Sequence, residues 1–430
     1  MAVQKVTRRN PWAWVPSLYF AEGIPYVVVM IVSVVLYKRM GLSNTDIALY
    51  TSWLYLPWVI KPLWSPFVDM FRTKRFWVVS MQFFIGVALA SVALTIPLPN
   101  FFQYTLAVLW LMAFSSATHD IAADGFYMLG LEEHQQAAFV GVRSTFYRVA
   151  MIVGQGILVV LAGVLEEQTG GDIPLAWSIT FFVLAAVFVI FAVYHTFVLP
   201  FPVSDRPVRR ANSGGVLRDF LDVFVLFFKK EGIMATLAFL LFFRFGEAQL
   251  VKMVTPFLLD DRELGGLGLT TSEVGVTYGT VGVVALLIGG LIGGYIVSRR
   301  GLKFWLWPMV IIMHTADLMF VYLSQAQPEN LLLINAAVAA EQFGYGFGFT
   351  AYMLYMILVA EGENKTAHYA ICTGFMALGM MLPGMVSGWI QEALGYKLFF
   401  IWIMLSTIPS FVVPALVKIP AGFGRKKEQE

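Results

Sequence analysis

The chain has 430 residues, of which 59% are hydrophobic and 13% charged, and its formal net charge is +2. Apolar stretches of about 20 residues, the length that a helix needs to cross a bilayer core of about 30 Å, recur along almost its whole length. This composition indicates a polytopic membrane protein, leaves no room for a large soluble domain, and excludes nucleic-acid binding by a basic surface.

The apolar stretches predict an all-α fold of roughly twelve membrane-spanning helices. We expect an N-terminal six-helix bundle over 1–199, a linker with an amphipathic helix over 200–231, and a C-terminal six-helix bundle with a short basic tail over 232–430. The predicted spans cover about 13–36, 46–69, 76–97, 102–130, 137–163, 175–199, 232–258, 272–298, 303–325, 329–360, 366–391 and 397–418.

Basic residues gather in alternate loops between these spans. By the positive-inside rule such loops are cytoplasmic, so both termini are expected to lie in the cytoplasm. The first span lacks a cleavage site behind a short apolar stretch, and we expect it to be retained in the lipid bilayer. The basic loops are those at 5–9, 72–75, 206–210 with 229–230, 299–303 and 425–427.

The first predicted half carries ionisable side chains inside its spans, where each costs several kcal/mol unless it faces a cavity or a partner. Asp120 and Asp124 are four residues apart and share one helix face. If the next span runs back antiparallel, residues at equal depth predict the pairs Asp120 with Arg148 and Asp124 with Arg143. These pairs either only lock the helices together, or one carboxylate takes up a proton and changes the packing.

The second predicted half carries Arg244 and Glu247 three residues apart, so the two can pair within one helix or meet an anionic substrate. His314 and Asp317 are also one turn apart, and we expect a structural role for them. Glu341 has no sequence-local partner, and the glycines at 344, 346 and 348 are expected to let helices approach or bend.

We therefore predict a small-molecule transporter with two sets of working residues. Aromatic faces such as those of Trp53 and Tyr345 either stack on sugar rings or only pack. The predicted proton carriers are Asp120, Asp124, Glu22, Glu247 and Glu341, and the predicted substrate-binding residues are Arg143, Arg148, Arg244, Lys61, Trp53 and Tyr345.

Several motifs are missing from the sequence. It contains no Gly-x-x-x-x-Gly-Lys-Ser/Thr, no Gly-x-Ser-x-Gly and no His-Glu-x-x-His. An ATP-driven pump is therefore not expected, and the energy should come from an ion gradient. We expect no enzyme activity, no cofactor and no metal, and the single Cys372 excludes an intramolecular disulfide.

Two stretches recur about 228 residues later, as expected for a transporter built from two parallel repeats. Residues 41–48 return as 268–275, and 67–79 return as 295–307. The second stretch, Asp69-Met-Phe-Arg72-Thr-Lys-Arg75, resembles the loop signature of the major facilitator superfamily. The resemblance implies gating roles for Asp69, Arg72, Arg75 and Arg300, although Val297 replaces the acidic residue in the second copy.

More specifically, the chain resembles the AmpG-type muropeptide permeases and the related peptide, acetyl-CoA and drug transporters. The resemblance implies proton-coupled import of fragments carrying N-acetylglucosaminyl-anhydro-N-acetylmuramic acid across the inner membrane of a Gram-negative bacterium. We also expect a monomer. It maps the family's acidic pair onto Asp120 and Asp124, and its helix 7 pair onto Arg244 and Glu247. The matching motifs are Phe20-Ala-Glu-Gly-Ile-Pro25, Lys61-Pro-Leu-Trp-Ser-Pro66, His119-Asp-Ile-Ala-Ala-Asp124, Tyr147-Arg148 and Gly384-Met-Val-Ser-Gly-Trp389.

Other interpretations of the same residues stay open. Carriers of siderophore complexes, acyl-CoA or drugs share the same framework, and Glu22 stands where the permeases often have a small polar residue. A membrane-embedded enzyme or receptor predicts a catalytic constellation near one surface, and the sequence shows none.

Overall fold

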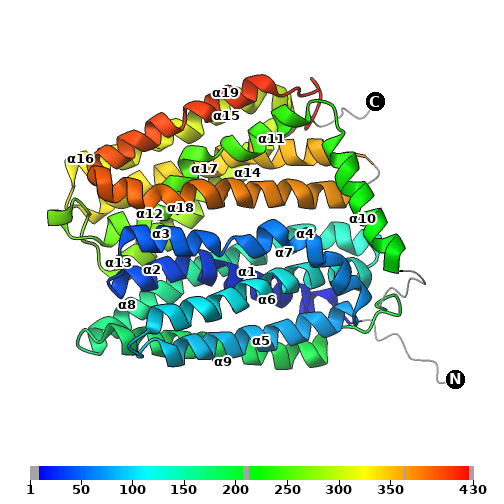
Figure 1. The fold of residues 1–430 in the computed structure, drawn as a ribbon, viewed down its shortest axis with the longest axis horizontal. Coiled ribbons are helices and arrows are strands. Elements are labelled where there is room, and N and C mark those ends of the chain that lie inside the picture. The colour runs from blue at the N-terminus through cyan, green and yellow to red at the C-terminus, as the bar shows by residue number, and fades with distance from the viewer. Residues whose placement is uncertain (1–8, 207–212, 363–364, 426–430) are drawn as a thin grey trace. The chain divides into compact units, whose positions relative to one another are not determined.

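The computed structural model describes residues 9–206, 213–362 and 365–425, and every regular element in these ranges is helical (Figure 1). The chain forms two compact units. The first comprises residues 1–36 and 60–213, and the second comprises 37–59 and 214–430. The predicted domain boundaries at 199 and 232 stay a prediction, because a division into compact units does not show whether each unit is a six-helix bundle.

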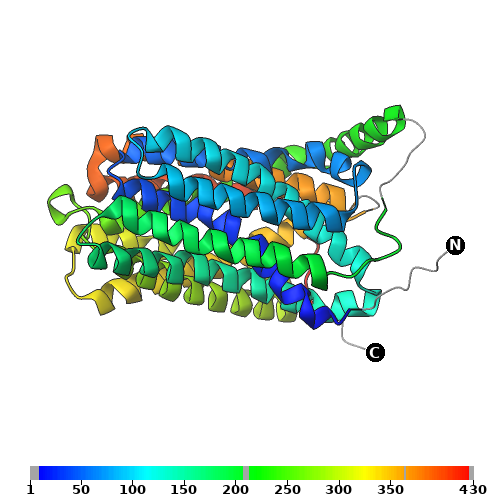
Figure 2. The same ribbon diagram turned by 90° about the horizontal axis from the view of Figure 1, so that it is seen from below.

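The first unit holds long helices that pack lengthwise. Helix α5 lies between α6 and α9, and α7 packs mainly along α1 (Figures 1 and 2). The sequence divisions between the units, after residues 36 and 59, fall within two helices, α2 (Ser33–Arg39) and α4 (Leu56–Met70). The other elements are η1 (Pro11–Ala13), α1 (Val15–Val27), η2 (Val28–Val32), α5 (Lys74–Thr95), α6 (Phe101–Gly130), α7 (Glu133–Ile152), η3 (Val153–Ile157), α8 (Leu158–Gln168) and α9 (Ile173–Val198).

The second unit is built around α17, which packs against α14 and α15, and around α18, which packs against α12 and α3. Its elements are α3 (Asn44–Trp53), α10 (Ser213–Phe228), α11 (Ile233–Phe242), α12 (Phe245–Leu259), η4 (Arg262–Leu264), α13 (Thr271–Val274), η5 (Gly275–Gly282), α14 (Val283–Arg300), α15 (Leu302–Ala316), α16 (Leu318–Ala326), α17 (Leu331–Ala360), α18 (Lys365–Ser406) and α19 (Ile408–Leu416).

Ten helices in the described ranges are long and apolar enough to cross a membrane, so the helical, membrane-spanning class is confirmed. The predicted span 46–69 is absent from these ten because it divides into the shorter α3 and α4. The last two predicted spans run together in one continuous stretch, whose backbone leaves helical geometry at Gly395 (φ 69°). The count of twelve, and the cytoplasmic termini, stay predictions.

The first sequence repeat is a helix N-cap in both copies. The Ser43 hydroxyl accepts from the Asp46 amide at 3.0 Å, and its counterpart Thr270 accepts from the Glu273 amide at 3.2 Å. Each hydroxyl also donates to the carboxylate of the same partner, at 2.8 Å and 3.0 Å. The repeated Ser/Thr-x-x-Asp/Glu pattern therefore starts a helix by the same mechanism in both copies.

Three π-helical segments interrupt helices in the described part of the chain. The segments η2 (Val28–Val32) and η3 (Val153–Ile157) contact each other in the first unit, and η5 (Gly275–Gly282) precedes α14 in the second. A π-turn holds one residue more than an α-turn, so each segment shifts the helical faces on its two sides relative to each other.

Glycines bring α17 close to both of its neighbours. A Cβ atom on Gly344 would lie 2.4 Å from the Ala316 Cβ of α15, and one on Gly346 would lie 2.0 Å from the Leu286 carbonyl oxygen of α14. Neither position has room for a methyl group. The predicted role of these glycines in helix approach is confirmed, and the close approach also sets the position of Glu341 one turn earlier.

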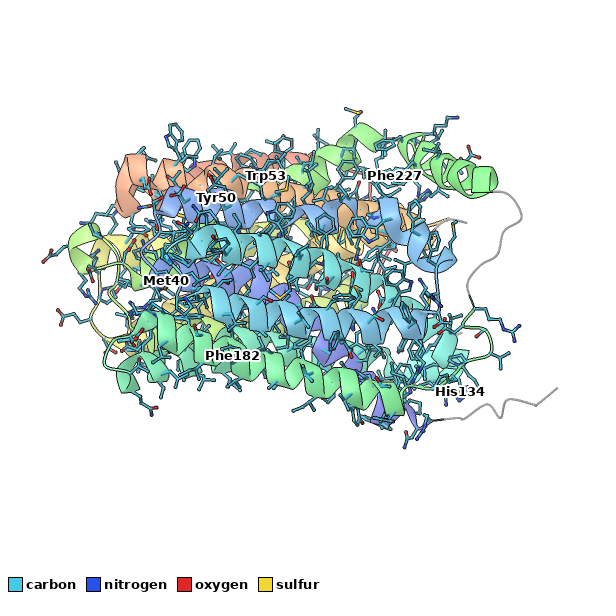
Figure 3. All side chains as sticks on the ribbon, turned by 60° about the horizontal axis from the view of Figure 1, so that its bottom comes forward. Met40, Tyr50, Trp53, His134, Phe182 and Phe227 are labelled. Atoms are coloured by element: carbon cyan, nitrogen blue, oxygen red, sulfur yellow. The ribbon has the colours of Figure 1, made fainter. Side chains whose placement is uncertain are left out.

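Helix α10 covers the linker residues whose apolar spacing predicted a helix, and it runs across the direction of the other helices of its unit (Figure 1). Its Phe227 is buried and stacks on Phe375 of α18 with ring centroids 6.4 Å apart (Figure 3). A position at the membrane surface stays a prediction.

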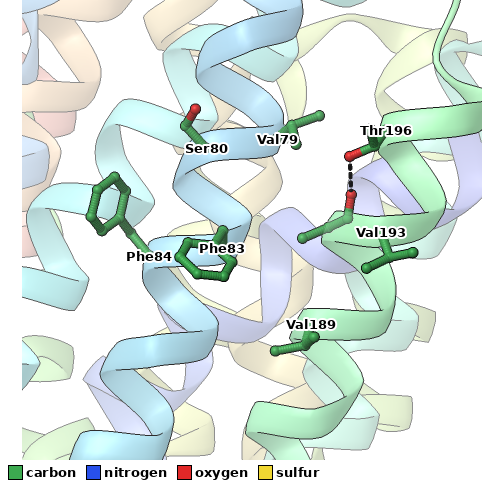
Figure 4. A pocket seen from close by; sticks show the side chains of 8 residues that line it. Val79, Ser80, Phe83, Phe84, Val189, Val193 and Thr196 are labelled. Carbon is green, nitrogen blue, oxygen red and sulfur yellow. Dashed lines mark hydrogen bonds between the residues drawn. The ribbon is translucent and has the colours of Figure 1, made fainter.

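The outer faces of α5 and α9 are apolar and form a shallow groove of about 360 Å³ (Figure 4). Phe83, Phe84 and Val193 line it and are each about half exposed. Thr196 is a polar exception, and its hydroxyl is satisfied by the Ala192 carbonyl at 2.7 Å. Such an apolar surface fits contact with lipid tails.

Candidate functional site

A first acidic cluster, formed by Glu22, Asp120 and Asp124, lies inside the first unit. Asp120 and Asp124 share one face of α6, as predicted, and Glu22 approaches them from α1. The Glu22 carboxyl is hydrogen-bonded to that of Asp120. Close packing of α1 on α7 helps to shape this site, because a Cβ on Gly23 would lie 2.8 Å from the Cβ of Ala150.

Two cations face this cluster. Lys61 of α4 forms an ion pair and hydrogen bond with Asp120, and both side chains are about one-fifth exposed, at 23% and 20%. Arg143 of α7 pairs with Asp124, with Nη2 at 3.0 Å from Oδ1. The predicted pair of Asp124 with Arg143 is therefore confirmed.

Aromatic side chains hold Arg143 in place. Its guanidinium lies over the ring of Tyr19 at 4.7 Å and over that of Tyr127 at 5.2 Å. The Tyr19 hydroxyl also donates to Asp124 at 3.0 Å. Tyr19 was not among the predicted site residues, although it lies three residues before Glu22 and so on the same helix face.

The predicted pair of Asp120 with Arg148 is wrong, because the cation bound to Asp120 is Lys61, and Arg148 is exposed. Arg143 and Arg148 were matched to their partners by depth alone. Five residues turn an α-helix by about 140° beyond one full turn, so the two arginines cannot share a face. A role for Arg148 in substrate binding stays a prediction.

The first acidic cluster holds one more acid than base. An ionised carboxylate has only acceptor atoms, so the hydrogen bond between Glu22 and Asp120 requires a proton on one of the two carboxyls. With that proton, the two remaining negative charges match the positive charges of Lys61 and Arg143. A proton on Glu22 leaves both ion pairs formed, whereas a proton on Asp120 neutralises its pair with Lys61. The cluster can therefore hold or release one proton.

A second acidic cluster, formed by Glu247, Asp317 and Glu341, lies inside the second unit. One oxygen from each carboxyl lies within 4.8 Å of the other two. All three side chains are buried, with 0%, 2% and 1% exposure. In the sequence Asp317 was expected to be structural, and its place in this cluster was missed. The only signal was an acid in the middle of an apolar span.

Arg244 does not form the predicted pair with Glu247. Its guanidinium donates to the Tyr345 hydroxyl and lies over the Phe349 ring at 4.7 Å, and both rings belong to α17. The cause is a break in the predicted span, because Arg244 is the N-cap of α12 with φ −114° and not a residue of a continuous helix. Spacing of three residues therefore does not align the two side chains.

Residues 37–59 are held in the second unit by polar contacts that the sequence did not predict. Lys38 pairs with Asp260 at 2.6 Å, and the Tyr396 hydroxyl donates to the other oxygen of Asp260 at 2.6 Å. The Asn44 amide donates to Gln391 at 2.6 Å. The first repeat is thus tied to the region around α18 as well as being a helix cap.

The remaining predicted residues are dispersed, and the contacts recorded for their described side chains are made away from the two acidic clusters. Trp53 ends α3 and is 39% exposed (Figure 3). Arg72 lies in the turn after α4 with φ 68°, Arg75 lies 3.8 Å over the Phe201 ring, and Arg300 lies 5.0 Å over the Phe304 ring. The side chain of Asp69 lies outside the described residues. Gating roles stay predictions.

Comparison with known proteins places the chain among membrane transporters. Residues 17–367 match the model of a family described as Major Facilitator Superfamily. The anhydromuropeptide permease of Escherichia coli (strain K12) is 26% identical over 403 residues, which cover 92% of this chain and 77% of the permease.

Solved structures agree in fold. A mutant of the nucleoside transporter NupG has a TM-score of 0.72 at 14% identity, covering 95% of this chain and 100% of that one. A D-xylose-proton symporter has a TM-score of 0.70 at 12% identity, with 96% and 98% covered. At these identities the likeness concerns the fold alone.

Proposed function

Since the chain belongs to the major facilitator superfamily, we propose that it is a proton-coupled importer of muropeptides, cell-wall fragments carrying N-acetylglucosaminyl-anhydro-N-acetylmuramic acid. The observation that carries the coupling is the first acidic cluster, with three carboxyls against two cations. The cargo rests on the 26% identity to a protein named anhydromuropeptide permease.

The coupling mechanism follows from the charge balance of the cluster. A proton that binds Asp120 neutralises the carboxylate that Lys61 contacts. A proton that binds Glu22 neutralises the carboxylate that lies beside Asp120. Its release restores the negative charge and strengthens the attraction to the cation. Proton binding and release thereby favour two different arrangements of α1, α4 and α6, as alternating access in this superfamily requires.

The cargo would meet cationic and aromatic side chains. Arg244, held between Tyr345 and Phe349, offers a guanidinium beside two rings, which suits a carboxylate attached to a planar peptide group or to a sugar ring with an apolar C–H face. The same chemistry suits another bulky anion, such as a siderophore complex, an acyl-CoA or a drug. We further propose a monomer in the bacterial inner membrane that serves peptidoglycan recycling.

The test is uptake of labelled anhydro-muropeptide by proteoliposomes, with and without an inward proton gradient. We expect the gradient to raise the initial rate in the wild type and in Glu167→Gln, which alters an exposed carboxyl of the same unit. We expect the gradient to have no effect in Asp120→Asn. Wild-type uptake at the same rate with and without the gradient would exclude symport. If the wild type takes up no muropeptide, another bulky anion would be the better candidate for the cargo.

A further inference from the structure

The second acidic cluster has buried oxygen atoms with nothing to bind. Five of its six carboxyl oxygens are buried without a hydrogen-bond partner: both of Glu247, both of Asp317 and Oε1 of Glu341. The sixth, Oε2 of Glu341, accepts from the Gln342 amide at 3.0 Å. Buried polar groups in folded proteins are nearly always satisfied, so this concentration calls for a bound species.

The neighbouring side chains do not supply the missing partner. His314 is nearest, with Nδ1 3.5 Å from Asp317 Oδ2, which is beyond the length of a normal hydrogen bond. Its ring is packed beside Phe243 and Phe411. Arg244, the other cation in reach, is directed at Tyr345.

The spacing of the three carboxyls matches the coordination shell of a metal ion. Calcium binds carboxylate oxygens at about 2.3–2.6 Å, so two oxygens on opposite sides of one ion are up to about 5 Å apart. The three oxygens of this cluster lie within 4.8 Å of one another. Acids that share a proton are joined by a hydrogen bond, as Glu22 and Asp120 are in the first unit, and five oxygens of the second acidic cluster have no such partner.

The elements that carry the three acids hold them in this arrangement. Glu247 lies in the first turn of α12, and Asp317 lies at the junction where α15 ends and α16 begins. Glu341 is placed by the glycine contacts of α17, since Gly344 packs directly on Ala316 beside Asp317. The three acids thus come from three separate segments that the packing brings together.

We propose that Glu247, Asp317 and Glu341 form a binding site for a hard divalent metal cation such as Ca²⁺ or Mg²⁺. All its protein ligands are carboxylate oxygens, the donors that such cations prefer. Three carboxylates beside one guanidinium, that of Arg244, leave two negative charges, which one divalent ion neutralises. No metal was expected from the sequence, because the three acids lie far apart in the chain and form no sequence motif of metal ligands.

The experiment uses the full chain, purified and stripped of metal with EDTA. Binding of ⁴⁵Ca²⁺ to the wild type is measured by equilibrium dialysis, and the melting temperature is followed while CaCl₂ or MgCl₂ is added. NaCl and choline chloride at equal ionic strength serve as controls. We expect saturable binding of about one ion per chain and a melting temperature that rises to a plateau, since an ion that binds only the folded state stabilises it.

Matched variants assign the ion to the site. Asp317→Asn and Glu341→Gln keep the side-chain shape and should lose the response, whereas Glu329→Gln, an exposed acid of the same unit, should keep it. No saturable binding by the wild type, a response to NaCl alone, or equal responses in all variants would each overturn the proposal. The wild-type binding measurement decides even if a variant fails to fold. None of these measurements involves transport, so they hold whether or not muropeptide is the cargo.

Discussion

The two acidic clusters have the same number of carboxyls but opposite surroundings. In the first unit, Asp120 and Asp124 each have a cation, and Glu22 shares a hydrogen bond with Asp120. In the second unit, most carboxyl oxygens have no partner at all. Buried acids therefore do not all have the same role in this fold. The number of cations beside them, and the spacing between them, decide what species they can hold.

The largest effect is expected from Asp120→Asn in the first acidic cluster. The change leaves Lys61 without its anion, and breaking one partner of a buried ion pair costs about 3–5 kcal/mol. Because this pair is about one-fifth exposed, we expect the lower end of that range, together with a loss of gradient-driven uptake of more than about tenfold. Initial rates in proteoliposomes measure it, and wild-type rates in the variant would remove Asp120 from the coupling proposal.

An effect of opposite sign is expected from Asp317→Asn in the second acidic cluster. Without metal, this change replaces a buried acid whose two oxygens lack hydrogen-bond partners by an amide that cannot ionise, and we expect stability to rise by about 1–3 kcal/mol. The melting temperature in EDTA should exceed that of the wild type. A lower melting temperature in EDTA would mean that the carboxylate is satisfied, and the contrast between the clusters would disappear.

The packing that positions Glu341 can be weakened by one methyl group. Gly344→Ala places a Cβ 2.4 Å from that of Ala316, and such overpacking costs about 1–3 kcal/mol. A shift of α17 away from α15 should also lower the affinity for Ca²⁺, measured by dialysis. The control is Gly294→Ala in α14, which has open space and should be neutral or stabilising by up to about 1 kcal/mol.

The smallest effect is expected between Asp120 and Arg148. A double-mutant cycle of Lys61→Gln with Asp120→Asn should show a coupling energy of about 0.5–3 kcal/mol, because the two side chains are in contact. The matched cycle of Arg148→Gln with Asp120→Asn should be additive within about 0.5 kcal/mol. Both are read from melting temperatures. Equal coupling energies in the two cycles would instead support the predicted pair of Asp120 with Arg148.

Much of the fold could be predicted because it depends on local properties. Helix rise and the thickness of a bilayer locate most of the spans to within a few residues, although 46–69 divides into two helices and the last two spans run together. The Ser/Thr-x-x-Asp/Glu pattern marks helix starts. The pair of Asp124 with Arg143 was also predictable, since depth and face happened to agree. The limit lies in rotation about the helix axis, which the sequence does not reveal without knowing the neighbours.

The errors at the candidate site share that cause. Lys61 was not matched to Asp120, because the two lie on spans that are not consecutive. Asp317 was set aside because its sequence neighbour His314 offered a local explanation, while its spatial neighbours Glu247 and Glu341 are distant in the chain. The break at Arg244 misled the spacing argument in the same way, since a three-residue interval aligns side chains only within one continuous helix.

The π-helical segment η2 (Val28–Val32) sets how the helical faces before and after it are aligned in the first span. Glu22 precedes this segment and Lys38 follows it, and each has its partner in a different unit. Deleting one residue of η2 would let an ordinary α-helix form there while the faces on its two sides keep their relation, whereas a deletion elsewhere between Glu22 and Lys38 would rotate everything beyond it by about 100°. Evolution of this span is therefore expected to tolerate the loss of one codon between 28 and 32 more readily than the loss of one elsewhere between Glu22 and Lys38.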